Sequence, residues 1–163
     1  MDKAIATARL PYAAQPHTTN SEKKHRYIVN PFTAVADILF ALMMPSIDRA
    51  WFAEVRNETE NSLLTVTLAL RAYRLEHGKY PDTLTELVSS YLKIVPNDPF
   101  ALKGKLRYKL TGDSYVLYSV GPDGKDDGGK PVEAAKNGKS VSENRFMMEE
   151  TSKGDIVAGI NKN

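Results

Sequence analysis

The chain has 163 residues, of which 42% are hydrophobic and 26% are charged. These values are close to the averages of globular domains, which excludes disorder throughout the chain, and the length suits one domain with extensions. Cysteine is absent, which excludes disulfides, thiolate metal sites and a cysteine nucleophile.

The positive charge belongs to one end of the chain. Residues 1–30 carry five Lys and Arg against two Asp and Glu, whereas the rest of the chain carries 17 against 18. A nucleic-acid-binding domain needs a clustered basic face, and the body of the chain shows none, so we expect no nucleic-acid partner. Residues 1–30 also contain few apolar residues and no apolar core of a secretory signal, and we expect a flexible arm before a domain at 31–163.

The first apolar run covers residues 34–44, between Pro31 and Pro45. It predicts a short helix at 31–45. A membrane-spanning helix needs about 20 apolar residues, so we expect none here. A core helix is the simplest interpretation; peripheral association of residues 34–44 with a membrane, or contact with a partner, stays open.

A long helix is predicted at 46–78, with Ser46 as its N-cap and Gly78 as the residue that ends it. Its first half carries a narrow apolar stripe, and its second half is apolar on most sides. We therefore expect the second half to be buried on a sheet and the first half to project as a protein-contact surface. The residues expected at that surface are Ile47, Trp51, Phe52 and Val55.

The second half of the chain predicts a small sheet. A short helix is expected at 83–91, capped by Asp82. Alternating and apolar stretches then predict strands at 105–110, 115–120 and 156–160, the first two joined as a hairpin. The expected fold class is α+β, a long N-terminal helix packed on an antiparallel sheet of about three strands.

Residues 121–129, which we call the acidic loop, contain three Asp and four Gly. Carboxylates this close repel one another unless a cation or solvent separates them, and hard oxygen ligands are those that Ca²⁺ takes. Asp155, next to the last predicted strand, is a candidate distant contributor. The loop is not an EF-hand, because Lys125 and Ala134 stand at ligand positions, and Pro131 rules out a phosphate-binding P-loop. A solvated acidic turn without an ion stays open.

The order of motifs between residues 64 and 127 is informative as a set. Tyr80-Pro81 follows the long helix, Asp98-Pro99 precedes the first strand, and the second strand runs into Tyr118-Ser119-Val120-Gly121-Pro122-Asp123. Together these motifs resemble the C-terminal domain of the major pseudopilin of type II secretion systems. They are closer still to the pseudopilin-G-like domains of large bacterial proteins.

The resemblance implies a helical spine on a small antiparallel sheet, with a structural calcium ion in the loop after the second strand. The ligands it implies are the carbonyls of Val120 and Lys125 and the carboxylates of Asp123, Asp155 and either Asp126 or Asp127. It also implies a structural, filament-type assembly component at the cell envelope, in the periplasm or outside the cell. Protein partners or further copies would then contact the long helix.

Two alternatives remain beside this interpretation. The second interpretation after the assembly component is a protein-binding module of a larger envelope protein that does not polymerise. A hydrolase that uses a metal in the acidic loop would need an open coordination position and a general base, for which the sequence offers no clear candidate. Histidines occur only at 17, 25 and 77, and no serine lies in a G-x-S-x-G motif, so we expect no enzyme.

Overall fold

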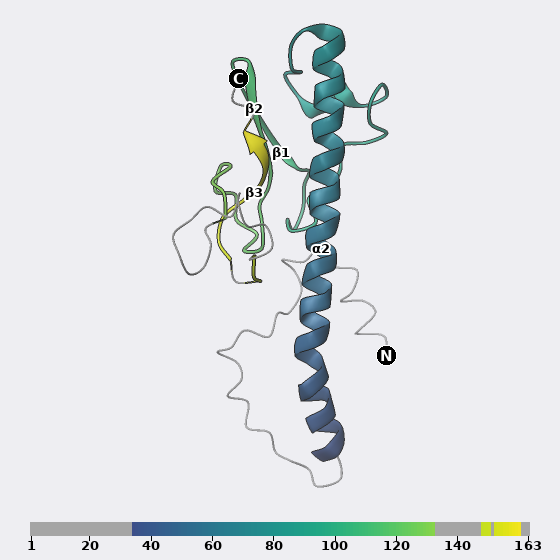
Figure 1. The fold of residues 1–163 in the computed structure, drawn as a ribbon, viewed down its shortest axis with the longest axis vertical. Coiled ribbons are helices and arrows are strands. Elements are labelled where there is room, and N and C mark those ends of the chain that lie inside the picture. The colour runs from purple at the N-terminus through teal and green to yellow at the C-terminus, as the bar shows by residue number, and fades with distance from the viewer. Residues whose placement is uncertain (1–33, 133–147, 151, 161–163) are drawn as a thin grey trace.

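The computed structural model describes residues 34–132, 148–150 and 152–160. Within them, one long helix stands beside a small sheet (Figure 1). The elements are α2 (Ala34–His77), the 3₁₀ helix η3 (Leu84–Leu87) and the strands β1 (Arg107–Thr111), β2 (Ser114–Ser119) and β3 (Ile156–Ile160). The predicted arm at 1–30 lies outside the described residues.

Helix α2 is continuous from Ala34 to His77. The prediction of two helices, at 31–45 and 46–78, is therefore wrong, because the helix runs through Pro45. A proline has no N–H group to donate to the preceding turn, so one helical hydrogen bond is missing at Pro45. The helix nevertheless continues on both sides of it. The predicted end is confirmed: Gly78 takes a left-handed φ of 75° and its N–H donates to the Arg74 carbonyl at 2.8 Å.

Among the described residues, no helix is both long enough and apolar enough to cross a bilayer. The side chains of residues 34–48 lie outside the described part of the structure. Peripheral membrane contact through 34–44 therefore stays a prediction.

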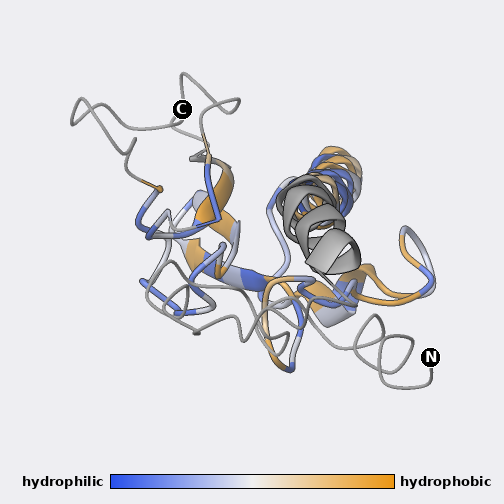
Figure 2. Cartoon of the chain, turned by 90° about the horizontal axis from the view of Figure 1, so that it is seen from below, coloured by the Kyte–Doolittle hydropathy of each residue, from blue (hydrophilic) through white to orange (hydrophobic). Residues whose placement is uncertain are grey.

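One face of α2 is buried along most of its described length. Its buried side chains recur every three or four residues. They are the apolar Phe52, Val55, Leu63, Val66, Ala69 and Leu70, with the buried Thr59 between Val55 and Leu63. The opposite face leaves Leu64, Leu68 and Leu75 exposed by 56%, 56% and 87%. The second half of α2 therefore packs on the sheet as expected, but its apolar residues are buried on one face only. The sheet and the segment around η3 cover only part of the helix circumference (Figure 2).

The predicted protein-contact surface on α2 also needs correction. Phe52 and Val55 are only 7% and 6% exposed and belong to the molecule's own core. The Phe52 ring lies 6.0 Å from that of Phe100, and Trp51 is half-buried against the same core. Ile47 is among the residues whose side chains are not described. The projecting surface expected in the first half of the helix is therefore largely an internal contact.

The short helix predicted at 83–91 is only the single turn η3. Its N-cap is Thr83 rather than Asp82, and the Thr83 N–H donates to Glu86 Oε1 at 2.9 Å. The turn ends because Val88 is extended and Ser89 has a φ of 83°, which a helix cannot contain.

The three strands form an antiparallel sheet in the order β1-β2-β3. The β1–β2 hairpin closes through Gly112 and Asp113, and the φ of 57° at Gly112 suits a type II′ turn. Strand β2 is central and largely buried, as expected, and β3 lies at the predicted residues. The α+β class, with a long helix on a small three-stranded antiparallel sheet, is confirmed.

Candidate metal centre

A buried carboxylate anchors the start of the acidic loop to the core. Asp98 is 3% exposed, and its carboxylate accepts hydrogen bonds from the Ser119 hydroxyl at 2.6 Å, the Val120 N–H at 2.9 Å and the Phe100 N–H at 3.1 Å. The Ser119 oxygen in turn accepts from the Gly121 N–H at 3.3 Å. Asp98 therefore fixes the point at which β2 passes into the loop.

The sequence analysis considered Asp98 only as part of the Asp98-Pro99 motif and missed this role. The available signal was Ser119, the single polar residue in an otherwise apolar strand segment. A buried hydroxyl needs a partner, and here that partner comes from a loop 21 residues earlier in the chain.

Asp155 holds the far side of the acidic loop. Asp155 is 1% exposed. Its carboxylate accepts hydrogen bonds from the N–H groups of Asp127 at 3.3 Å and Gly129 at 2.6 Å. Its backbone pairs with the same region, because its N–H donates to the Lys130 carbonyl at 2.8 Å. The sequence analysis expected Asp155 to reach this loop, and the structure places it there.

The two chain segments meet without room for a side chain. A Cβ on Gly121, whose φ is +70°, would lie 2.2 Å from the carbonyl oxygen of Gly154. Only glycine fits a contact this short at that backbone angle. The start of the loop is thereby held against the residue before Asp155.

Asp126 is the most extensively bonded of the three loop carboxylates. Oδ1 accepts from the Tyr118 hydroxyl and the Gly128 N–H, both at 3.0 Å, and Oδ2 pairs with Arg107 Nε at 3.2 Å. The Gly128 N–H is the main cause that lowers the pKa of Asp126. Burial, followed by the bond to Asp126, raises the pKa of Tyr118 to about 12. Protein donors thus occupy both oxygens of Asp126.

The other two loop carboxylates are less constrained. Asp123 Oδ1 accepts from the Lys125 N–H at 3.1 Å, in a tight turn closed by the Gly124 N–H on the Gly121 carbonyl. Asp127 is exposed, and its carboxylate accepts no hydrogen bond from the described residues. Val120, whose carbonyl was an expected ligand, is 2% exposed, whereas Lys125 is exposed.

The electrostatics single out Asp155. Burial raises its pKa, the N–H bonds from Gly129 and Asp127 oppose that rise, and repulsion from the carboxylates of Asp126 and Asp127 adds to it. A charged carboxylate that is buried near two others is a position at which a cation is stabilising.

The donor chemistry therefore fits Ca²⁺, since every candidate ligand is a hard oxygen. The carboxylates alone do not form the site: within the described ranges, no group of three or more His, Cys, Asp or Glu side chains is placed to hold a metal. Backbone carbonyls would have to complete the coordination.

Comparison of the chain with protein-family models, with curated proteins and with solved structures finds no match. The pseudopilin resemblance accordingly rests on the sequence motifs themselves.

Proposed function

We propose that the chain is a non-enzymatic structural or assembly component at the cell envelope, of the type II secretion pseudopilin kind, with a calcium-stabilised acidic loop. The observation that supports this most is the way the elements are joined. A long helix packs on a three-stranded antiparallel sheet, and the central strand leads directly into the acidic loop, which the buried Asp155 holds from the other side.

In this proposal the calcium ion takes its ligands from the carboxylates of Asp123, Asp127 and Asp155 and from the carbonyls of Val120 and Lys125. Because these three carboxylates do not converge on one point in the described structure, binding of the ion would have to draw them together. Asp127 suits the role better than Asp126, whose oxygens already serve Arg107, Tyr118 and Gly128. The ion would supply positive charge to a loop in which Lys125 to Gly128 are exposed and contribute little apolar burial. Metal binding would then appear as stability of the folded loop.

The calcium proposal is tested by thermal unfolding in EDTA, Ca²⁺ and Mg²⁺. Saturating Ca²⁺ should raise Tm by about 5–10 °C, since an excess of about 100-fold over Kd contributes about 2.7 kcal/mol. The rise should be absent in Asp123→Ala and retained in Asp113→Ala, which removes an exposed carboxylate from the β1–β2 turn. Equal behaviour of the two variants, or no shift at all, would leave the loop an ordinary acidic turn.

The assembly proposal assigns contact between copies to the exposed face of α2. That face carries Leu64, Leu68 and Leu75 and lies opposite the helix's buried side. Sedimentation over a range of concentrations separates the two candidate roles. A sedimentation coefficient that rises with concentration favours assembly. A chain that stays monomeric favours the alternative, a protein-binding module of a larger envelope protein.

A further inference from the structure

Strand β1 is an edge of the sheet, and part of its backbone has no hydrogen-bond partner in the part of the chain that the structure describes. In the β1–β2 register Thr111 lies opposite Ser114 at the two-residue turn. In such a hairpin the flanking pair exchanges both hydrogen bonds and every second pair repeats this. Arg107, Lys109 and Thr111 therefore direct their backbone groups to β2, and Tyr108 and Leu110 direct theirs away from it.

Among the described residues, only the start of this outer edge is covered by the chain itself. The Leu106 N–H donates to the Pro96 carbonyl at 3.3 Å, and Asn97 forms an isolated bridge with Lys105. Beyond Leu106, no described residue bonds to the backbone of Tyr108 or Leu110 on that side. Within the described ranges, two N–H and two C=O groups of β1 are thus available to another strand.

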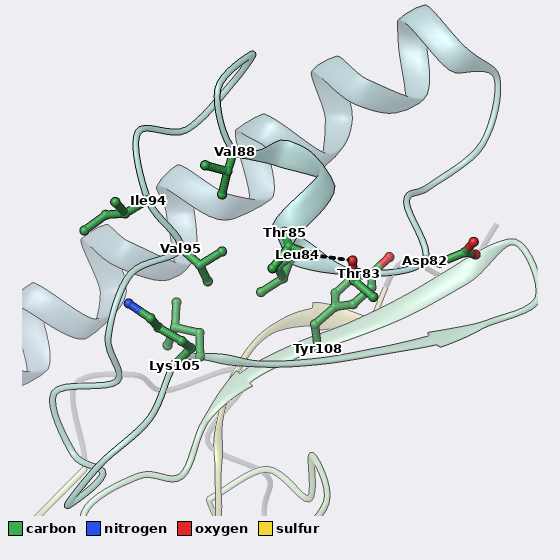
Figure 3. A pocket seen from close by; sticks show the side chains of 10 residues that line it. Asp82, Thr83, Leu84, Thr85, Val88, Ile94, Val95, Lys105 and Tyr108 are labelled. Carbon is green, nitrogen blue, oxygen red and sulfur yellow. Dashed lines mark hydrogen bonds between the residues drawn. The ribbon is translucent and has the colours of Figure 1, made fainter.

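A groove of about 500 Å³ runs beside this edge, between β1 and the segment around η3 (Figure 3). Its apolar lining consists of Leu84, Val88, Ile94, Val95, Leu106 and Tyr108. The Tyr108 hydroxyl donates to the Pro81 carbonyl at 2.8 Å, which fixes the ring across the groove. Ile94 is 68% exposed and therefore offers apolar surface that the described fold does not use. We call this region, with the free edge of β1, the β1 groove.

The charges around the β1 groove indicate which kind of peptide strand could bind there. Lys105 lines one end and Lys109 lies on the edge strand; both are exposed, and neither ammonium group has a partner among the described residues. Two copies pairing edge to edge would bring these lysines together, which is unfavourable. The chain's own arm at 1–30 is also basic. An acidic strand is complementary to this edge. Asp82 lies at the groove's other end (Figure 3), and the carboxylates of Asp82 and Glu86 both act on Tyr108 inside the groove. Acidic side chains of the added strand are therefore disfavoured inside the groove, where apolar ones fit, and are favoured on its outer side, toward the lysines.

The geometry points to the β1 groove as a docking site for an extended acidic peptide of a partner protein. The peptide adds a strand beside Tyr108 and Leu110, places alternate apolar side chains in the groove, and directs its acidic side chains toward Lys105 and Lys109. In strand addition the main-chain bonds supply affinity and the side-chain pockets supply specificity. This site uses neither the acidic loop nor the outer face of α2, so its test is independent of the proposed function.

The test is fluorescence polarisation of the full chain with a labelled peptide, Ser-Glu-Val-Glu-Ile-Glu-Val-Ser. We expect saturable binding at micromolar concentrations. Ile94→Asp should weaken binding about tenfold or more, since it removes an apolar contact from the groove. The matched control is Leu102→Asp, at an exposed leucine (59%) that does not line the groove, and it should leave Kd unchanged. Both positions are exposed, so neither change should unfold the chain.

Two further measurements test the strand geometry and the charge preference. The same peptide with alternate backbone nitrogens methylated cannot pair with β1 and should not bind. Lys109→Glu should weaken binding several-fold, and a peptide with Lys in place of Glu should bind more weakly than the acidic one. Absence of binding, equal loss in Ile94→Asp and Leu102→Asp, or equal binding of the methylated peptide would overturn the proposal. Dimerisation of the chain alone that Ile94→Asp abolishes would also overturn it, because the groove would then be a self-interface.

Discussion

Asp98 illustrates how one buried carboxylate organises distant parts of this fold. It receives three hydrogen bonds from Ser119, Val120 and Phe100 and has almost no contact with solvent. Asp98→Ala leaves these donors buried without an acceptor, so we expect a loss of about 3–5 kcal/mol in the free energy of unfolding, measured by urea denaturation. Asp82→Asn, at an exposed position, should cost less than about 0.5 kcal/mol. An equally small loss in Asp98→Ala and Asp82→Asn would show that the hydrogen bonds of Asp98 contribute little to the free energy of unfolding.

At the residue scale, the sequence indicated which acidic residues belong to the loop, but not which side chains they would contact. The run of Asp and Gly at 121–129 indicated an acidic loop, and Asp155 was recognised as its distant contributor. The pairing of Asp126 with Arg107, from the facing strand β1, could not be read from the sequence. It depends on the strand register, which places Arg107 opposite Tyr118 and therefore near the loop.

At the scale of elements, alanine substitutions at two glycines of the acidic loop distinguish the cost of a left-handed backbone from the cost of a steric clash. Gly121 and Gly128 have similar φ values of +70° and +72°, but a Cβ meets the Gly154 carbonyl only at Gly121 and finds nothing within 4 Å at Gly128. Gly128→Ala should therefore cost only about 1–2 kcal/mol, the penalty of a left-handed alanine. Gly121→Ala should cost about 3–5 kcal/mol because the loop must also move away from Gly154, in the segment before β3. Chemical denaturation of both variants is the check, and similar losses would contradict the close contact.

The junction of η3 with α2 predicts a pH dependence. The Thr83 N–H, aided by the Tyr73 hydroxyl at 3.1 Å, lowers the pKa of Glu86. A lowered pKa in the folded state means that ionised Glu86 stabilises the fold above its ordinary pKa, and that this contribution is lost as the pH falls. Glu86→Gln should thus lower Tm by about 2 °C at neutral pH, and its difference from the parent chain should shrink as the pH falls through the lowered pKa of Glu86.

Thermal melts from about pH 3 to pH 7 would measure this difference. The control is Glu58→Gln, an exposed residue of α2 for which no partner is described. A constant Tm difference between Glu86→Gln and the parent chain at all pH values would contradict an electrostatic origin.

The elements themselves were predictable where the signal was local. The end of α2 at Gly78, the hairpin and the last strand follow from glycine positions and from alternation of apolar residues. The break expected at Pro45 and the longer helix expected at 83–91 failed for opposite reasons. A proline did not end the first helix, whereas the extended Val88 and the left-handed Ser89 ended η3 without any proline or glycine.

At the scale of the whole molecule, the division of α2 into two faces has a consequence for assembly. Its inner face forms the core, and its outer face exposes three leucines that contribute little to the fold. Replacing Leu64 and Leu68 together with Gln should leave Tm within about 2 °C of the parent chain, since exposed positions carry little stability.

If copies associate through this outer face, the same double variant should weaken self-association at least about tenfold, since two apolar contacts of about 1.5 kcal/mol each are lost. Sedimentation velocity over a wide concentration range measures this, with Glu54→Gln as an exposed helical control. Association that is unchanged in the double variant would assign the contact to another surface. A parent chain that stays monomeric throughout would contradict assembly and leave the binding-module role, for which the β1 groove provides an independent site.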